Sequence, residues 1–328
     1  MEISQNFTES SVTESDGLNS SSDVHRRLII SGVSLGCCLT SAAGSILALG
    51  CAFLISHGDR KKKTFYKWII GERLIVYLSV IDLIFCSNGI MEQVLQLYQT
   101  KSAEYNIPVA LCKGIAFISL SIILAQISLE LFIAINAFVM VVRSKKLYLG
   151  RRDALLFIPV LGIPLAITAV CLETNMMTNE QMTRNYWCSI ADDMWMKILT
   201  GIVFSTLVAI MTLYISVWVK LKQSEPEVVM KSAGNSRKRK YQKSARIMAI
   251  LVMAFLIQFW PYIVYSFSSW IKGQIGFIEN VLVSSFTNLG GILNFLAYTH
   301  IRKYYLSKGS KWASSDNPKE ASQNQSSV

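Results

Sequence analysis

Three polar residues stand inside stretches of the sequence that are otherwise apolar. Asp82, Glu130 and Asn294 each lie within a long run of aliphatic and aromatic residues. Because a polar or ionisable side chain is costly to bury in lipid, each marks a candidate functional site. Together they could form one network that holds a proton or a cation, or they could brace the fold through static hydrogen bonds.

The elements that must position these side chains are seven apolar stretches, each near or above the roughly 20 residues that a membrane-spanning helix needs. The predicted spans are residues 28–55, 74–98, 111–142, 155–172, 195–219, 247–270 and 277–301. Backbone polar groups cannot stay unpaired in lipid, so the spans must be helices. The predicted fold is therefore an all-α bundle of seven transmembrane helices.

The basic residues indicate the orientation of the bundle. Most of the 32 Lys and Arg residues follow the first, third, fifth and seventh spans, and basic connectors remain in the cytoplasm. The amino terminus is thus predicted to be external and the carboxyl terminus cytoplasmic. At about 1.5 Å of rise per residue, the three polar residues fall in the cytoplasmic half of their spans. Asn6 and Asn19 stand in glycosylation acceptor sequences, as expected of an external segment.

The composition bounds the class of protein. We expect a disordered, glycosylated external segment (1–27), one membrane domain (28–306) and a disordered cytoplasmic tail (307–328). The net charge of +11 is distributed as basic collars beside the spans, which favours anionic membrane lipids over nucleic acid as partners. The connectors are too short for a soluble catalytic domain, and the histidines lie outside the bilayer core. We therefore expect neither an enzyme nor a metal or other cofactor.

Two cysteines differ from the other five. Cys112 stands at the external start of the third span, and Cys188 stands in the external loop between the fourth and fifth spans. Both face an oxidising compartment, so they can form a disulfide bond that holds this loop over the bundle. The other cysteines lie within or at the ends of apolar spans, as small buried hydrophobic residues do.

Prolines interrupt two of the predicted helices. Pro159 and Pro164 lie in the fourth span, and Pro261 lies in the sixth. A proline removes one hydrogen bond from the helical ladder. Each is either a static kink or, in the sixth span, a hinge.

Three motifs resemble those of rhodopsin-like G-protein-coupled receptors. Leu78-Ser79-Val80-Ile81-Asp82-Leu83 is similar to the Leu-Ala-x-x-Asp-Leu motif of their second span. Asn294-Phe295-Leu296-Ala297-Tyr298 is similar to Asn-Pro-x-x-Tyr in the seventh span, with phenylalanine replacing proline. The Phe-x-x-Cys-Trp-x-Pro motif of the sixth span has its counterpart in Phe255, Phe259, Trp260 and Pro261, where Phe259 takes the place of the tryptophan.

Other segments depart from that pattern. Asn136, Ala137 and Phe138 stand where the Asp-Arg-Tyr triplet is expected, so the ionic latch of the rhodopsin-like class is missing. Three segments instead resemble secretin-like and cyclic-AMP-receptor-like receptors: Leu161-Gly162-Ile163-Pro164-Leu165, Tyr186-Trp187-Cys188-Ser189-Ile190 and Gly291-Ile292-Leu293-Asn294. The chain is accordingly identified as a divergent member of the superfamily near the cyclic-AMP-receptor-like group.

The resemblance implies a plasma-membrane receptor that carries the signal of an unknown extracellular ligand to a heterotrimeric G protein. Asp82, Glu130, Asn294 and Tyr298 would form a polar switch network, and Pro261 would provide the hinge. The expected ligand contacts are Glu92, Trp187, Tyr262, Tyr265 and Glu279. The expected G-protein docking residues are Arg143, Lys145, Lys146, Lys243 and Arg246.

Further partners and one competing class follow from the same residues. Phosphorylation of serines in the tail would recruit an arrestin after a receptor kinase has acted. The seventh span contains no lysine for a retinal Schiff base, which excludes an opsin-like light receptor. A transporter or ion channel that uses buried Asp82 and Glu130 remains the alternative.

Overall fold

The computed structural model describes residues 16–59, 65, 70–101, 108–143, 153–174, 193–230, 236–272 and 276–300, and it is helical throughout these ranges except at isolated turn and cap positions. Six helices are long and apolar enough to cross a membrane, or seven if the bent pair Phe277–Thr287 and Gly290–His300 is one span. The predicted all-α bundle of seven spans is confirmed.

Five spans are single helices, namely α1 (Asp16–Asp59), α2 (Ile70–Lys101), α3 (Val109–Val142), α6 (Asp193–Met230) and α7 (Ser236–Lys272). The fourth span consists of α4 (Ala154–Phe157), a π-helical segment (Ile158–Gly162) and α5 (Ile163–Glu173). The seventh consists of α8 (Phe277–Thr287) and the helix Gly290–His300. We call the end of the bundle at Ile70 and Arg143 the predicted cytoplasmic end, and the opposite end the predicted external end.

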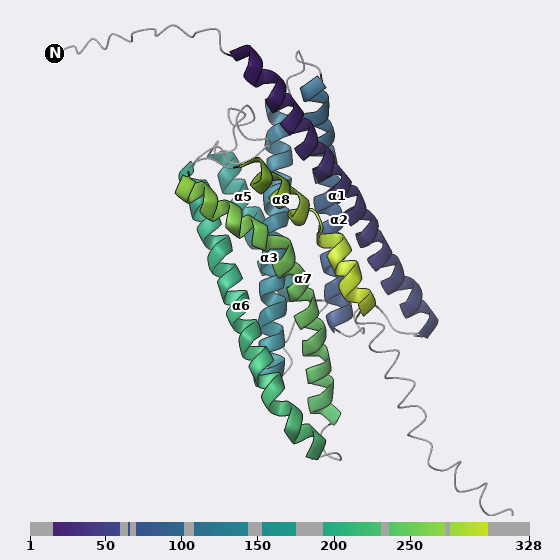
Figure 1. Ribbon diagram of the computed structural model, residues 1–328. Coiled ribbons are helices and arrows are strands. Elements are labelled where there is room, and N and C mark those ends of the chain that lie inside the picture. Colours follow the sequence, from purple (N-terminus) through teal and green to yellow (C-terminus); the bar gives the residue numbers. More distant parts are fainter. Residues whose placement is uncertain are drawn as a thin grey trace, which may run out of the picture.

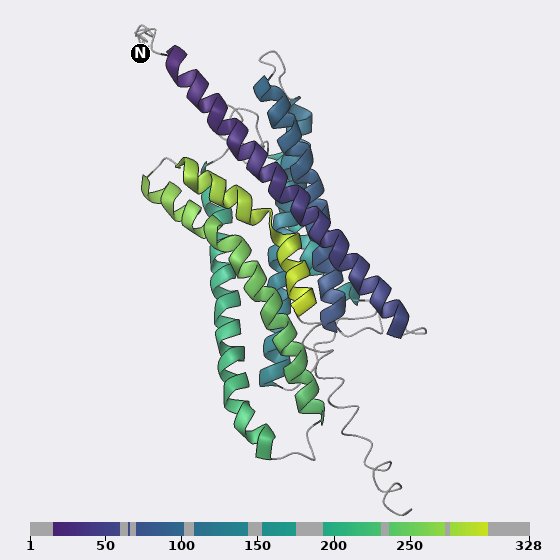
Figure 2. The same ribbon diagram turned by 45° about the vertical axis from the view of Figure 1, so that its right-hand side comes forward.

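The helices surround α3, which contacts α2, α5, α6 and α7 (Figures 1 and 2). The first helix, α1, runs obliquely along α2 and also contacts α8. This arrangement places the seventh span between α1 and α7, so that its side chains can reach both.

Helix α1 begins earlier than the sequence indicated. It starts at Asp16, so residues 16–27, which we expected to be disordered, are helical. Extending a helix that is already formed fixes one residue for each added hydrogen bond, whereas starting one is costly. The long apolar span therefore provides a nucleus from which the polar residues before it continue the helix.

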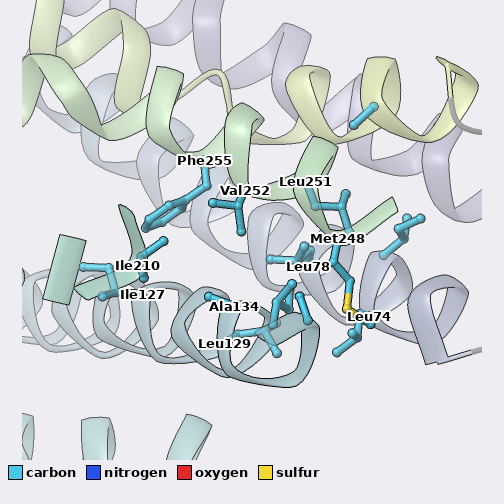
Figure 3. Close-up of a cluster of buried hydrophobic side chains, with 14 of the residues drawn as sticks. Leu74, Leu78, Ile127, Leu129, Ala134, Ile210, Met248, Leu251, Val252 and Phe255 are labelled. Atoms are coloured by element: carbon cyan, nitrogen blue, oxygen red, sulfur yellow. The ribbon is translucent and has the colours of Figure 1, made fainter. Parts of the chain in front are cut away.

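The core lies between α2, α3, α6 and α7, where buried apolar side chains of all four helices interlock (Figure 3). Leu74 and Leu78 come from α2, Ile210 from α6, and Met248 and Phe255 from α7. The outer surface is also apolar, as Trp218 at 69% exposure illustrates. A bundle in lipid needs no polar outer face, since its surroundings are as apolar as its interior.

The prolines of the two spans have different effects. The π-helical segment of the fourth span holds Pro159, and Pro164 follows directly in α5. Proline has no N–H to donate, and a π-helical turn is a common irregularity within α-helices. The sixth span, by contrast, is assigned as one helix through Pro261.

Candidate functional site

Asp82 is the centre of a chain of hydrogen bonds inside the bundle. Asn294 Nδ2 donates to Asp82 Oδ2 at 2.6 Å, and Gln126 Nε2 donates to Asp82 Oδ1 at 3.0 Å. Gln126 Nε2 also lies 3.2 Å from Gln258 Oε1. All four side chains are at most 4% exposed. The chain thus joins α2, α3, α7 and the second half of the seventh span.

The seventh span breaks beside this network. Its two helices meet at an angle of 47°, with Asn288 and Leu289 in the turn between them. The carbonyl oxygen of Thr287 accepts a hydrogen bond from Gln258 Nε2 at 2.9 Å, and Gly291 N donates to Ser41 Oγ at 2.8 Å. Since lipid offers no hydrogen bonds, these side chains satisfy backbone groups at the break.

Glycine is required at the break because the network approaches the backbone closely. A Cβ atom added to Gly290 would lie 2.8 Å from both Asp82 Oδ1 and Gln258 Nε2. The break is therefore packed directly against the polar chain, and a change in either must affect the other.

Glu130 and Tyr298 were expected to join Asp82 and Asn294 in one network. Glu130 is 1% exposed, but within the described part of the chain its Oε2 atom has no hydrogen-bond partner. Tyr298 lies in the core at 9% exposure. The structure thus brings Asp82 and Asn294 together and leaves Glu130 outside their hydrogen bonds.

Sequence reasoning missed Gln126 and Gln258. Both are neutral amides in apolar spans. The prediction of the buried polar network rests on ionisable side chains and one asparagine, so it does not include them. Their positions contained a signal, because Gln126 precedes Glu130 by one helical turn and Gln258 lies three residues before Pro261. A neutral amide side chain within the bilayer must have hydrogen-bond partners, as a carboxylate must.

The predicted external half contains a second set of buried polar side chains. Asn88 Nδ2 donates to Ser119 Oγ at 2.6 Å, and Ser31 Oγ donates to Gln96 Oε1 at 3.2 Å. Glu92, one of the expected ligand contacts, lies on α2 between Asn88 and Gln96 and is 6% exposed. This half of the bundle thus holds buried polar side chains from α1, α2 and α3, and ligand binding there stays a prediction.

The other expected ligand contacts lie mainly near the external ends of α7 and α8. The Tyr262 and Tyr265 rings stack with centroids 6.3 Å apart. Glu279 Oε1 accepts a hydrogen bond from Ser268 Oγ at 2.6 Å, and its Oε2 accepts one from Gly276 N at 2.9 Å. Glu279 thus caps α8 and ties it to α7. Trp187 lies outside the described residues.

The expected hinge residues divide between the core and the outer surface. The Phe255 and Phe259 rings pack with centroids 4.7 Å apart in the core, and Pro261 is buried. Trp260 is 49% exposed and its ring meets that of Phe286 edge to face. Trp260 therefore faces away from the polar chain.

An ion pair that the sequence analysis did not predict joins α2 to the start of the fourth span at the predicted cytoplasmic end. Arg73 Nη1 of α2 lies 2.6 Å from Asp153 Oδ2, and Tyr77 Oη donates to the same oxygen at 2.8 Å. Asp153 directly precedes α4 and has a left-handed backbone with φ of 61°. The Tyr77 ring also packs edge to face against Phe157. These contacts fix the start of the fourth span against α2.

Several expected site residues lie in parts of the chain of which the structure describes little. Arg143 is exposed at the end of α3, as a docking residue must be. Lys145 and Lys146 lie outside the described residues, and of Lys243 and Arg246 only the helical backbone is described. Docking of a G protein at these residues stays a prediction.

The same holds for the expected covalent modifications. Cys112 is disulfide-bonded, whereas Cys188, its expected partner, lies outside the described residues, as does Asn6. Asn19 lies in the first turns of α1. The pairing of the two cysteines and glycosylation of the two asparagines stay predictions.

The comparisons agree with this geometry. The family model described as 7 transmembrane receptor (rhodopsin family) matches residues 59–300. Among curated proteins no match is found. The match does not support the closer relation to cyclic-AMP-receptor-like or secretin-like receptors, and a transporter or channel is not favoured. The chain belongs to the rhodopsin family of seven-transmembrane receptors.

Proposed function

We propose that this G-protein-coupled receptor binds its ligand in the polar external half of the bundle and transmits the signal through the Asp82 chain and the break in the seventh span. The observation that carries this proposal is the bond from Gln258 to the carbonyl of Thr287. Gln258 also bonds to Gln126 of α3. A displacement of α7 therefore acts on hydrogen bonds to both α3 and the seventh span.

The physical requirement for signalling is a difference in ligand affinity between two packings of the helices. A ligand held between Glu92 on α2 and Tyr262 or Tyr265 on α7 would favour one separation of these helices. Moving α7 changes the position of Gln258, which bonds to Gln126 and Thr287. The cytoplasmic ends of α6 and α7 would then move to admit a G protein beside Arg143.

The remaining partners follow from this function. We place the receptor in the plasma membrane with its amino terminus outside, and we expect an arrestin and a receptor kinase to act on the serine-rich tail. A disulfide bond between Cys112 and Cys188 would hold the external loop over the ligand site. The basic residues near the bundle would contact anionic lipids.

The test is guanine-nucleotide exchange on a panel of purified heterotrimeric G proteins, with the full-length receptor in lipid nanodiscs and a broad panel of ligands. We expect at least one heterotrimer to exchange nucleotide faster with receptor than with empty nanodiscs, and one ligand class to alter that rate. Exchange at the empty-nanodisc rate with every heterotrimer and ligand would contradict the proposal. In that case, flux of a substrate or ion into proteoliposomes would favour the transporter or channel.

A further inference from the structure

Two polar atoms in the centre of the apolar core have no hydrogen-bond partner among the described residues. They are Glu130 Oε2 on α3 and the Tyr214 hydroxyl on α6. Their residues are 1% and 9% exposed. A buried donor or acceptor without a partner destabilises the conformation that contains it, because no water reaches it. One of these atoms is an acceptor and the other a donor.

Tyr214 lies in the same buried cluster as Leu129 and Ile133, which flank Glu130, and α3 contacts α6. Ile127 of α3 and Ile210 of α6 lie together in the core (Figure 3). Both helices run toward the predicted cytoplasmic end, so Glu130 and Tyr214 each lie one turn deeper on the same faces. Neither the Glu130 Oε2 atom nor the Tyr214 hydroxyl is hydrogen-bonded within the described part of the chain in this conformation.

The contacts that hold α3 at this depth are weak. Asn136 Nδ2 donates to Met248 Sδ of α7 at 3.6 Å, and sulfur is a poor acceptor. Asn136 Oδ1 has no hydrogen-bond partner among the described residues. Ala137 stands next to it, where the motif would have an arginine. A rearrangement of α7 against α3 therefore breaks only a weak hydrogen bond at Asn136.

We propose that the Tyr214 hydroxyl donates a hydrogen bond to the Glu130 carboxylate in the signalling conformation, and that this bond stabilises that conformation. A bond made in only one of two conformations shifts the equilibrium toward it. A small rotation or shift of α6 would suffice, since the residues already face the same contact. The inference rests on the proposed signalling function.

The experiment is a double-mutant cycle on ligand-free nucleotide exchange. It uses the full-length receptor in nanodiscs and the heterotrimer that the panel identifies. Glu130→Met removes the acceptor at similar length, and Tyr214→Phe removes only the donor. Each should lower the exchange rate about threefold to tenfold, as expected for one hydrogen bond inside a membrane protein. The double variant should be no slower than the slower single variant. Glu130→Gln, which keeps an acceptor oxygen, should retain most of the rate.

Tyr98→Phe is the matched control, because it makes the same chemical change in a tyrosine of α2 that is 56% exposed and lies near the predicted external end of the bundle. It should leave exchange unchanged. Additive effects of Glu130→Met and Tyr214→Phe would overturn the inference, and so would an unchanged rate in Tyr214→Phe alone, even if Glu130→Met failed to fold. A wild-type receptor that activates no heterotrimer would contradict the proposed function instead, so the two failures can be told apart.

Discussion

Asp82 accepts one hydrogen bond at each carboxylate oxygen, from Gln126 and from Asn294. Asp82→Asn replaces one acceptor oxygen with an amino group that faces a donor. One of the two bonds is then lost, at a cost of about 1 kcal/mol. Removing a buried ionisable group offsets part of that cost. We expect a melting temperature close to that of the wild type and an altered rate of ligand-free nucleotide exchange.

Two measurements separate the effect on stability from the effect on signalling. The melting temperature of the purified receptor reports the first, and its nucleotide-exchange rate reports the second. If Asp82→Asn left exchange and its response to ligand untouched, Asp82 would be a static brace and not part of a switch. A large loss of melting temperature would indicate that the carboxylate serves mainly to hold the bundle together.

Gln258 links the polar chain to the break in the seventh span. Gln258→Met keeps the length of the side chain but leaves the partly buried Thr287 carbonyl without its donor. A buried acceptor without a partner costs about 1–3 kcal/mol, so the melting temperature should fall. The neighbouring variant Ile257→Met changes a side chain that is 44% exposed on the outer surface. Equal stability of the two variants would show that the Gln258 bond contributes little.

The elements differ in how far the sequence predicts them. The spans could be predicted because lipid forces long apolar segments into helices. The break in the seventh span could not, because Phe295 replaces the expected proline and the break lies earlier, at Asn288 and Leu289. The position of Glu130 within an apolar span could be predicted, whereas the absence of a hydrogen bond from its Oε2 atom to the described residues depends on how the helices pack.

A substitution at Gly290 tests whether the break in the seventh span needs its close packing against the polar chain. In Gly290→Ala the new methyl group would lie 2.8 Å from Asp82 Oδ1 and Gln258 Nε2. Both atoms are held by hydrogen bonds, so making room for the methyl group costs at least one bond, about 1–3 kcal/mol. We expect a lower melting temperature and altered exchange.

The matched control is Gly201→Ala in the first third of α6, where an added Cβ meets nothing within 4 Å. Alanine favours a helix by up to about 1 kcal/mol over glycine, so this variant should be as stable as the wild type or more so. If Gly290→Ala melted at or above the temperature of Gly201→Ala, the seventh span would not need its close approach to the network.

The Arg73–Asp153 pair ties α2 to the start of the fourth span. Asp153→Ala leaves the partly buried Arg73 guanidinium, 12% exposed, without its partner. The cost should lie below the range of about 3–5 kcal/mol for fully buried pairs. Alanine also tolerates the left-handed backbone of this position less well than aspartate or asparagine does. The melting temperature of the receptor should therefore fall markedly, and that of Asp153→Asn should fall less.

The double variant Arg73→Met/Asp153→Ala identifies the cause. It removes the unpaired charge, so its loss of stability should be smaller than the sum of the two single losses. Additive losses would mean that the two side chains stabilise the bundle independently and that their ion pair is incidental.

At the scale of the whole molecule, the apolar outer surface and the charge distribution act together. The exposed aliphatic and aromatic side chains fix the bundle in lipid, but they do not determine which end faces outward. That choice depends on the connectors, since Lys and Arg are retained in the cytoplasm. The basic residues behind the net charge of +11 are thus expected to determine the orientation of the bundle and its contact with anionic lipids.

Orientation can be measured with epitope tags at the two termini of the full-length receptor. On unpermeabilised cells an antibody should reach the amino-terminal tag and not the carboxyl-terminal one, and permeabilisation should expose both. An odd number of spans requires this difference, because the chain must end on the side opposite to its start. Glycosidase treatment should increase gel mobility, and Asn6→Gln/Asn19→Gln should abolish that change. Labelling of the carboxyl-terminal tag on intact cells, with a cytosolic marker unlabelled, would reverse the assignment of the external and cytoplasmic ends and with it the placement of both proposed binding sites.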